Sequence, residues 1–382
     1  MRRWLLIALL LLAGAGASAC SDDGGASSAD AGRDDAGAEA APSDGAPSSD
    51  ADAGLTDAPS ESTVDAPGAR SCAGPGEDGT RTALCTDDVF TVGGHQRLAV
   101  VCKPAPLPSG PLPLVLGFHG GGGNASQWRN TLAWELTAAR YGFVFVFMQG
   151  CRDNVADCSG SASYLWNVGK QGESSSVDDQ AYTLEVIKRL KAVHGLEIDS
   201  GCRFATGHSL GGIFSYSLLC DQPTLLTAIG PISATPTDAT CTPHGGTSIF
   251  HVHGVVDDNV PLDGCCSLAQ QTPASAQYLA GCASLARCAN PLNWWPPVRS
   301  GKHPFHDGVG LDALATGLGC SGGWQQSSKS GATSCYAYPS CAAGRSVEGC
   351  LVGGVAHSLG NLDSAVDLRD HLWKRFSSHP AR

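Results

Sequence analysis

The sequence predicts an α/β fold with a mostly parallel central sheet and helices on both of its faces. Apolar runs of strand length, such as 112–118 and 143–147, alternate with segments that have helix caps or helical periodicity. Gly207-His208-Ser209-Leu210-Gly211 lies between a strand-like segment and an apolar helix-like one. Strands that alternate with helices are typical of parallel sheets. The roughly 310 residues from 71 to 382 suffice for one large domain.

The expected elements follow along the chain. The sequence predicts strands at 97–103, 112–118, 143–147, 202–206, 228–233 and 247–253, with another before residue 357. Helices are expected at 125–140, from a capped start at 176–179 to about 190, at 213–219, and from Asn361 to Phe376. The apolar residues expected to face the core from the second and last helices are Ala181, Leu184, Ile187 and Leu190, and Leu362, Ala365, Val366, Leu372, Trp373 and Phe376.

The first twenty residues have the pattern of an export signal. Met1-Arg2-Arg3 precedes an apolar run over 4–12 and then small residues up to Cys20. The run is too short to span a bilayer. The segment before Cys20 resembles a bacterial lipobox, with Ala17 where leucine is usual. We therefore expect residues 1–20 to be a lipoprotein-type signal peptide and Cys20 to carry a membrane anchor; plain secretion is the alternative.

Residues 21–70 predict a disordered tether. They consist mostly of Ala, Asp, Ser, Gly and Pro, and hold twelve acids against two arginines. Such a segment buries too little apolar area to offset its chain entropy. The whole chain carries −12 and residues 1–20 carry +2, so about −4 remains for residues 71–382. With no basic patch, binding to nucleic acid is not expected.

Sixteen cysteines follow Cys20, and all lie between residues 72 and 350. An even number of cysteines in an exported chain predicts disulfides, here as many as eight. Cys151 and Cys158 flank a polar loop that they can close. Cys265, Cys266, Cys282 and Cys288 fall within one Ala-, Ser- and Gln-rich segment. Because the chain has no Cys-x-x-Cys pair, we expect no structural zinc site.

The segment around Ser209 predicts a nucleophile elbow. A Gly-x-Ser-x-Gly sequence between a strand and a helix places the serine on a tight turn, where the neighbouring positions must be small. Gly207 and Gly211 meet that requirement. The N-terminus of the following helix would point its positive end toward an oxyanion.

A serine nucleophile needs a base and an acid that orients the base, and in α/β-hydrolases the chain order is Ser, Asp or Glu, then His. Asp257 follows a buried strand that ends at His253, with Asp258 as the second choice. His357 lies between a predicted strand and the last helix, unlike its competitors His303 and His306 in a proline-rich loop. The predicted catalytic residues are therefore Ser209, Asp257 and His357.

The run His119-Gly120-Gly121-Gly122-Gly123 follows a buried strand and predicts an oxyanion loop. We expect the amides of Gly121 and Leu210 to form the hole, with Gly122 as an extra donor and His119 ordering the loop. A phosphate-binding loop is disfavoured because the Gly-Lys-Ser/Thr ending is missing. His251 and His253 share a strand face, but they have no evident third ligand for a metal, and no cofactor is expected.

Five motifs together resemble the secreted esterase and depolymerase family that includes polyhydroxybutyrate depolymerases and feruloyl and acetylxylan esterases. They are Phe118–Gly122, Val177-Asp178-Asp179, Gly207–Gly212, His253–Asp257 with Val260-Pro261, and Gly353–His357, and Gly319-Cys320 with Tyr338–Cys341 and Gly344 resembles the cysteine-containing segment of that family. The resemblance covers about 85–376. It implies an α/β-hydrolase fold, the triad Ser209-Asp257-His357 and no metal. The sequence departs from the family after His357, where Trp-Pro is missing, and the segment 264–302 is long.

These features predict an exported serine carboxylester hydrolase. Its substrate would be an aromatic-acyl or acetyl ester of a plant polysaccharide, or a short-chain polyester. Trp166, Trp294 and Trp295 lie in predicted loops, where they either stack on a phenolic ring or sugar or pack in the core. Two alternatives stay open: an inactive, tethered surface protein, and a serine peptidase on the same fold.

Overall fold

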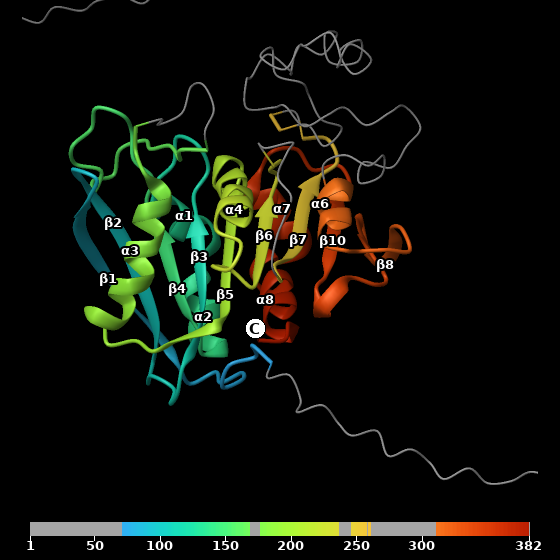
Figure 1. The fold of residues 1–382 in the computed structure, drawn as a ribbon, viewed down its shortest axis with the longest axis horizontal. Helices are drawn as coiled ribbons and strands as arrows, with labels where there is room; N and C mark the ends of the chain where they lie inside the picture. The colour runs from blue at the N-terminus through green and yellow to red at the C-terminus, as the bar shows by residue number, and fades with distance from the viewer. Residues whose placement is uncertain (1–70, 169–175, 237–245, 258, 261–310, 382) are drawn as a thin grey trace, which may run out of the picture. The chain divides into compact units, whose positions relative to one another are not determined.

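The computed structural model describes residues 71–168, 176–236, 246–257, 259–260 and 311–381 (Figure 1). The predicted signal peptide, the tether and the segment 264–302 lie outside these residues. So do Cys20, Asp258, Trp294, Trp295, His303 and His306. Among the described residues, no helix is both long and apolar enough to cross a membrane.

The described strands form one ten-stranded sheet in the order β1-β2-β4-β3-β5-β6-β7-β10-β9-β8. Strands β4, β3, β5, β6, β7 and β10 run parallel to one another, whereas β1 and β2 at one edge and β9 and β8 at the other add to them by antiparallel pairing. A parallel sheet with this strand order, in which the preceding strand β2 pairs antiparallel with β4, is the α/β-hydrolase fold. The strands are β1 Thr82–Val92, β2 His95–Ala105, β3 Leu112–Phe118, β4 Val144–Met148, β5 Ile198–His208, β6 Ala228–Ile232, β7 Ser248–Gly254, β8 Gln325–Ser330, β9 Thr333–Ala337 and β10 Val347–Val352.

Helices cover both faces of the sheet (Figure 1). They are α1 Ala125–Leu132, α2 Trp134–Tyr141, α3 Asp179–Ala192, α4 Leu210–Asp221, α6 Leu311–Gly317, α7 Leu359–Val366 and α8 Leu368–Ser378, with a short 3-10 helix at Ala342–Gly344. Buried side chains of α3, α4 and α6 belong to one hydrophobic cluster, and those of α1, α2, α7 and α8 belong to another. Every residue of β3, β4, β6 and β7 is buried, as expected of strands packed on both faces.

Two predicted helices are each divided in two. The segment 125–140 breaks at Ala133 and the last helix breaks at Asp367, because both residues adopt left-handed backbone with φ of 46° and 49°. The last helix also begins earlier than expected, since Ser358 rather than Asn361 is the N-cap of α7. Of its predicted core residues, Leu362, Leu372, Trp373 and Phe376 are buried, whereas Ala365 is exposed and Val366 is half-buried.

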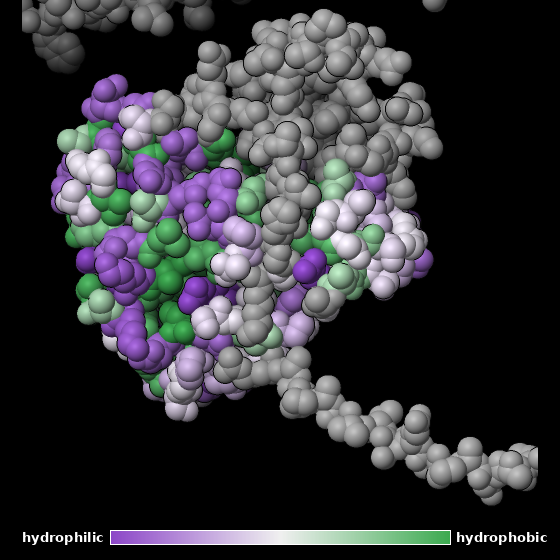
Figure 2. Space-filling view, viewed as in Figure 1, coloured by the Kyte–Doolittle hydropathy of each residue, from purple (hydrophilic) through white to green (hydrophobic). Residues whose placement is uncertain are grey.

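The predicted apolar face of α3 is wrong in part. Leu190 is buried as expected, but Leu184 is 42% exposed, and Tyr182, Thr183 and Val186 face the core instead. Figure 2 shows other hydrophobic residues at the surface of the molecule, among hydrophilic ones. The N-cap is Asp178, whose side chain accepts a hydrogen bond from the Ala181 amide at 2.8 Å.

Five disulfides lie within the described part of the chain. Cys151 and Cys158 are joined as predicted. Two others link directly paired residues of neighbouring strands, β1 with β2 and β9 with β10. The five pairs are Cys72–Cys202, Cys85–Cys102, Cys151–Cys158, Cys320–Cys341 and Cys335–Cys350, and Cys220 is also disulfide-bonded.

Candidate active site

Ser209 lies on the turn between β5 and α4, near the middle of the sheet. Its backbone is strained, with φ 54° and ψ −124°, a conformation that non-glycine residues rarely adopt. The Ser209 amide donates to the Ile232 carbonyl on β6 at 2.9 Å, which holds the turn against the sheet. This geometry is that of a nucleophile elbow.

The two glycines of the motif allow the turn to form. A Cβ atom on Gly211 would lie 2.2 Å from the Phe118 carbonyl oxygen and 2.5 Å from that of His119. A Cβ on Gly207 would lie 2.4 Å from the carbonyl carbon of Gly211. The neighbouring atoms are backbone and cannot rotate away, so only glycine permits this close approach.

We therefore expect Gly211→Ala to lower the free energy of unfolding by about 3 kcal/mol or more, because a backbone clash cannot be repacked. Chemical denaturation with a circular-dichroism readout measures the change. Gly360→Ala in α7 is the matched control, since a Cβ there meets no atom within 4 Å. Equal stability of the two variants would contradict the argument.

The glycine loop after β3 lies against the elbow. His119 is buried and orders the loop: its Nδ1 donates to the Gly120 carbonyl at 2.8 Å and its Nε2 accepts from the Gly150 amide at 3.0 Å. Burial lowers the pKa of His119 to about 4, so the ring is neutral, as these hydrogen bonds require. The expected ordering role of His119 is confirmed.

Two amides of the glycine loop donate hydrogen bonds within the protein, and a third, that of Gly121, does not do so among the described residues. The Gly122 amide donates to the Tyr164 carbonyl at 2.8 Å, and the Gly123 amide donates to Gly120 at 3.0 Å. The prediction of Gly122 as an extra oxyanion donor is therefore wrong. The amides of Gly121 and Leu210 have no hydrogen-bond acceptor among the described residues, and a Cβ on Gly121 would lie 3.4 Å from Leu210 Cβ. Gly121 therefore lies against Leu210, which directly follows Ser209.

Asp257 and His357 are brought together from separate loops. His357 Nδ1 lies 2.8 Å from Asp257 Oδ2 and 3.0 Å from Oδ1. The amides of Asn259 and Val260 donate to Oδ1 at 3.0 and 2.8 Å. Burial alone would raise the pKa of Asp257, but the hydrogen bond from His357, the nearby His253 and His357 rings and the Val260 amide together lower it. Asp257 is therefore an ionised carboxylate that orients the His357 ring.

The residue that precedes Ser209 lies against His357. The ring of His357 lies 4.6 Å, centroid to centroid, from the ring of His208, which directly precedes Ser209. Burial and then the neighbouring His357 lower the pKa of His208 to about 3, so His208 is neutral. Within the described part of the chain, no hydrogen bond joins Ser209 to His357. Contacts of this kind often shorten only when substrate is bound.

Trp166 does not offer a surface to a ligand. Its side chain has no exposed area and packs against the rings of Phe118 and Phe214. The indole N–H donates to the His119 carbonyl at 2.8 Å. Trp166 therefore packs in the core, and the prediction that it stacks on a substrate is wrong.

A cavity of about 270 Å³ lies beside the glycine loop, lined by His119, Gly120, Gly121, Gly122, Gly123, Gln127, Trp128, Thr131, His208 and Leu359.

The motif Val177-Asp178-Asp179 is structural. Asp179 is fully buried and accepts from Arg97 Nη2 at 2.6 Å and from the Asn167 amide at 2.7 Å. Arg97, on β2, also donates to the Gln149 carbonyl at 2.9 Å and lies over the ring of Tyr182. The ion pair fixes the start of α3 to the antiparallel edge of the sheet. Arg97 was expected only as the first residue of the strand predicted at 97–103, because its ion pair joins residues far apart in the sequence.

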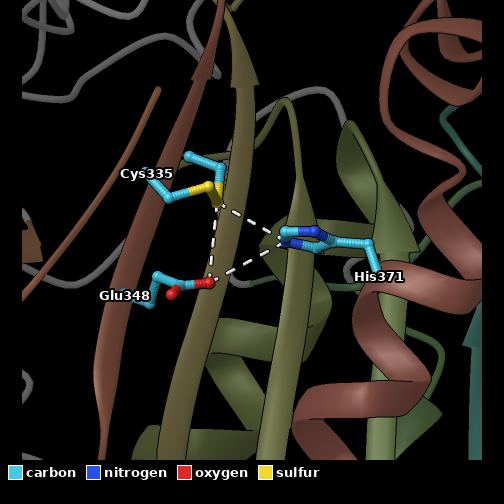
Figure 3. A group of neighbouring side chains, drawn as sticks. Cys335, Glu348 and His371 are labelled. Atoms are coloured by element: carbon cyan, nitrogen blue, oxygen red, sulfur yellow. Dashed lines mark hydrogen bonds and ion pairs between the residues drawn. A yellow bond between two sulfur atoms is a disulfide. The ribbon is translucent and has the colours of Figure 1, made fainter. Parts of the chain in front are cut away.

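One group of metal-ligand residue types lies on β9, β10 and α8 (Figure 3). Cys335 and Cys350 are joined as a disulfide, and metals bind thiolates rather than disulfide sulfurs. Glu348 accepts from Arg375 at 2.6 Å. Burial, followed by the charges of Arg375 and Lys374, lowers the pKa of His371 to about 3. With Cys335 and Cys350 joined as a disulfide, the contacts within this group hold α8 against the sheet. A second such group, His95 with Cys151 and Cys158, also contains a disulfide.

Sequence comparison finds relatives among esterases. A probable feruloyl esterase C from Aspergillus clavatus is 30% identical over 158 residues, which are 41% of this chain and 53% of that protein. A bifunctional acetylxylan esterase/xylanase from Neocallimastix patriciarum is 27% identical over 146 residues, 38% of this chain and 19% of that protein. The chain is related to these esterases. It spans about half the length of the feruloyl esterases that it matches, and the resemblance expected from the motifs is confirmed for the esterases.

Comparison with solved structures also finds esterases. An acetyl xylan esterase from Aspergillus awamori aligns over 76% of this chain and 99% of its own, with 14% identity and a TM-score of 0.45. A feruloyl esterase module from Clostridium thermocellum aligns over 78% of this chain and 89% of its own, with 11% identity and a TM-score of 0.41. No protein-family model matches the chain.

Proposed function

We propose that this protein is a serine carboxylester hydrolase with the triad Ser209, His357 and Asp257. The observation that carries the proposal is the pairing of His357 Nδ1 with the buried, ionised Asp257 beside a strained serine elbow. A carboxylate on Nδ1 fixes the tautomer of the imidazole and leaves Nε2 to accept a proton. This arrangement serves nucleophilic attack on a carbonyl carbon.

The reaction follows from the positions of these groups. Ser209 Oγ attacks the ester carbonyl while His357 accepts its proton and then passes that proton to the departing alcohol. The oxyanion is stabilised by the amides of Gly121 and Leu210, aided by the N-terminus of α4. Water, deprotonated by His357, then attacks the acyl carbonyl; the bond to Ser209 Oγ breaks, the acid leaves, and His357 returns the proton to Oγ. Asp257 stabilises the imidazolium that forms in both steps.

The substrate class is proposed from the relatives. They are named for feruloyl and acetylxylan esters, so we propose an aromatic-acyl or acetyl ester of a plant polysaccharide as the substrate. The cavity beside Gly121 and His208 is where one end of the ester would lie. Trp294 and Trp295, outside the described residues, remain proposed contacts for a phenolic ring or sugar.

A substrate panel tests the activity and its class. The purified protein is assayed with p-nitrophenyl acetate and butyrate, methyl ferulate, acetylated xylan, hydroxybutyrate oligomers and a peptide anilide. Turnover of the ferulate or xylan ester above the polyester supports the proposal. Faster cleavage of the anilide would make the protein a peptidase, and no turnover of any substrate would make it an inactive surface protein.

We also propose that the protein is exported and anchored through a lipid on Cys20. The signal-like residues 1–20, the acidic segment 21–70 and the disulfides, which are typical of oxidising compartments, support this. Membrane fractionation of wild type and Cys20→Ser tests it: only the wild type should partition with membranes. A mature protein that starts elsewhere than Cys20 would contradict the anchor.

A further inference from the structure

Three buried polar side chains form a line that ends at Asp257. Tyr216 lies on α4, and His251 and His253 lie on the same face of β7. All three have at most 2% of their surface exposed. Tyr216 OH lies 2.8 Å from His251 Nδ1, and His251 Nε2 lies 2.9 Å from His253 Nδ1. His253 Nε2 lies 2.8 Å from the Val260 carbonyl and 3.5 Å from Asp257 Oδ2.

The chemistry of these contacts fixes where each proton lies. The Val260 carbonyl only accepts hydrogen bonds, so His253 Nε2 carries a proton. In a neutral ring His253 Nδ1 must then accept, which places a proton on His251 Nε2. His251 Nδ1 then accepts from Tyr216 OH. Burial lowers the pKa of both histidines, so both rings are neutral near pH 7.

The line supports the loop that carries the triad acid. Val260 donates its amide to Asp257 and accepts from His253 through its carbonyl, so one residue connects the carboxylate to the line. At the other end, Tyr216 belongs to α4, the helix that begins directly after Ser209. The serine helix and the acid loop are therefore joined through buried hydrogen bonds as well as through the sheet.

The charge on His253 affects the triad because His253 lies close to Asp257. His253 is faced by Asp257 from the loop after β7, by His357 from the loop after β10, by His208 from the end of β5 and by His251 on β7 itself. A neutral His253 leaves the negative charge of Asp257 to His357. A protonated His253 would compete with the His357 imidazolium for that charge.

We propose that Tyr216, His251 and His253 are positioning residues that hold Asp257 in place and leave its charge available to His357. The inference rests on the proposed function. It adds to the triad a buried support that begins on the helix of the nucleophile. The three residues act through Asp257 and do not touch the substrate.

The test compares two substitutions of His253. Gln offers an NH₂ group for the Val260 carbonyl and an oxygen that accepts from His251, whereas Leu offers neither. We expect His253→Leu to lower kcat about 10- to 100-fold with KM little changed, the usual loss for a residue that orients a catalytic group. His253→Gln should restore kcat to within a few-fold of wild type. Ile249→Val, on the same face of β7, is the control that loses core packing without losing a hydrogen bond.

A second measurement does not depend on turnover. The proton on His357 Nδ1 that points to Asp257 should give a low-field NMR signal in wild type and in His253→Gln, and the signal should shift or broaden in His253→Leu. If His253→Leu does not fold, Tyr216→Phe removes only one hydroxyl and should still shift the signal and lower kcat. An unchanged NMR signal and kcat in the folded Leu or Phe variant would overturn the inference. If the wild type turned over no ester while the NMR signal changed in the variants as expected, only the proposed function would be overturned.

Discussion

Ser209→Ala should reduce ester turnover by about 10⁴-fold or more, because the nucleophile and base act as a unit and neither works alone. The substitution removes one half-buried hydroxyl, so the free energy of unfolding should change little. The measurement is kcat/KM with methyl ferulate and p-nitrophenyl acetate, together with a thermal melt. His357→Ala should cost about as much, and the double variant hardly more.

The control for Ser209→Ala is Ser217→Ala on the same helix. Among the residues that the structure describes, the Ser217 hydroxyl bonds only the Ile213 carbonyl of its own helix, so activity should stay near that of wild type. If Ser209→Ala kept most of its activity on every ester, the serine-hydrolase proposal would fail. The inactive surface protein would then be the better interpretation.

Asp257→Asn should reduce kcat by about 10³- to 10⁴-fold, somewhat less than the loss from Ser209→Ala. The amide removes the negative charge that stabilises the His357 imidazolium and favours the wrong imidazole tautomer. It keeps an oxygen for the amides of Asn259 and Val260, so the loop should stay folded. The measurement is kcat between pH 5 and 9, with circular dichroism to confirm the fold.

Asp258→Asn is the matched control for Asp257→Asn. Asp258 lies outside the described residues, but His357 already pairs with both oxygens of Asp257. We therefore expect Asp258→Asn to be nearly silent. A severe loss in Asp258→Asn and a mild one in Asp257→Asn would move the triad acid by one residue and leave the mechanism unchanged.

The buried strands were predicted well because burial on both faces leaves an unbroken apolar run. The predicted bounds of the strand Leu112–Phe118 are the observed ones, and the strand predicted at 143–147 is observed one residue later, at Val144–Met148. The elbow was also predictable, since its glycines are dictated by backbone contacts next to Ser209. The pairing of Asp257 with His357 was expected from the Ser, Asp, His order of α/β-hydrolases and from the position of each residue after a predicted strand.

The edge strands and helix breaks could not be predicted in the same way. Strand β8 is exposed along its whole length and therefore shows no apolar pattern. Ala133 and Asp367 break their helices through left-handed backbone that neither residue type signals strongly. The face of α3 was misassigned because Tyr182 is buried under Arg97, a long-range contact that periodicity does not contain. Tyr216 was overlooked as a polar group, although a buried tyrosine hydroxyl in an apolar helix needs a partner.

The Cys72–Cys202 disulfide has a mechanical consequence. It connects Cys72, which precedes β1, to β5, the fifth strand in the order of the sheet, across 130 positions of the sequence. Tension applied to the chain before Cys72 would therefore pass through a covalent bond into the middle of the sheet, without first peeling away β1 and β2. The strand that receives the load also ends at the nucleophile. A pull on the N-terminal segment would thus be resisted by β3 and β6, the two strands that pair with β5.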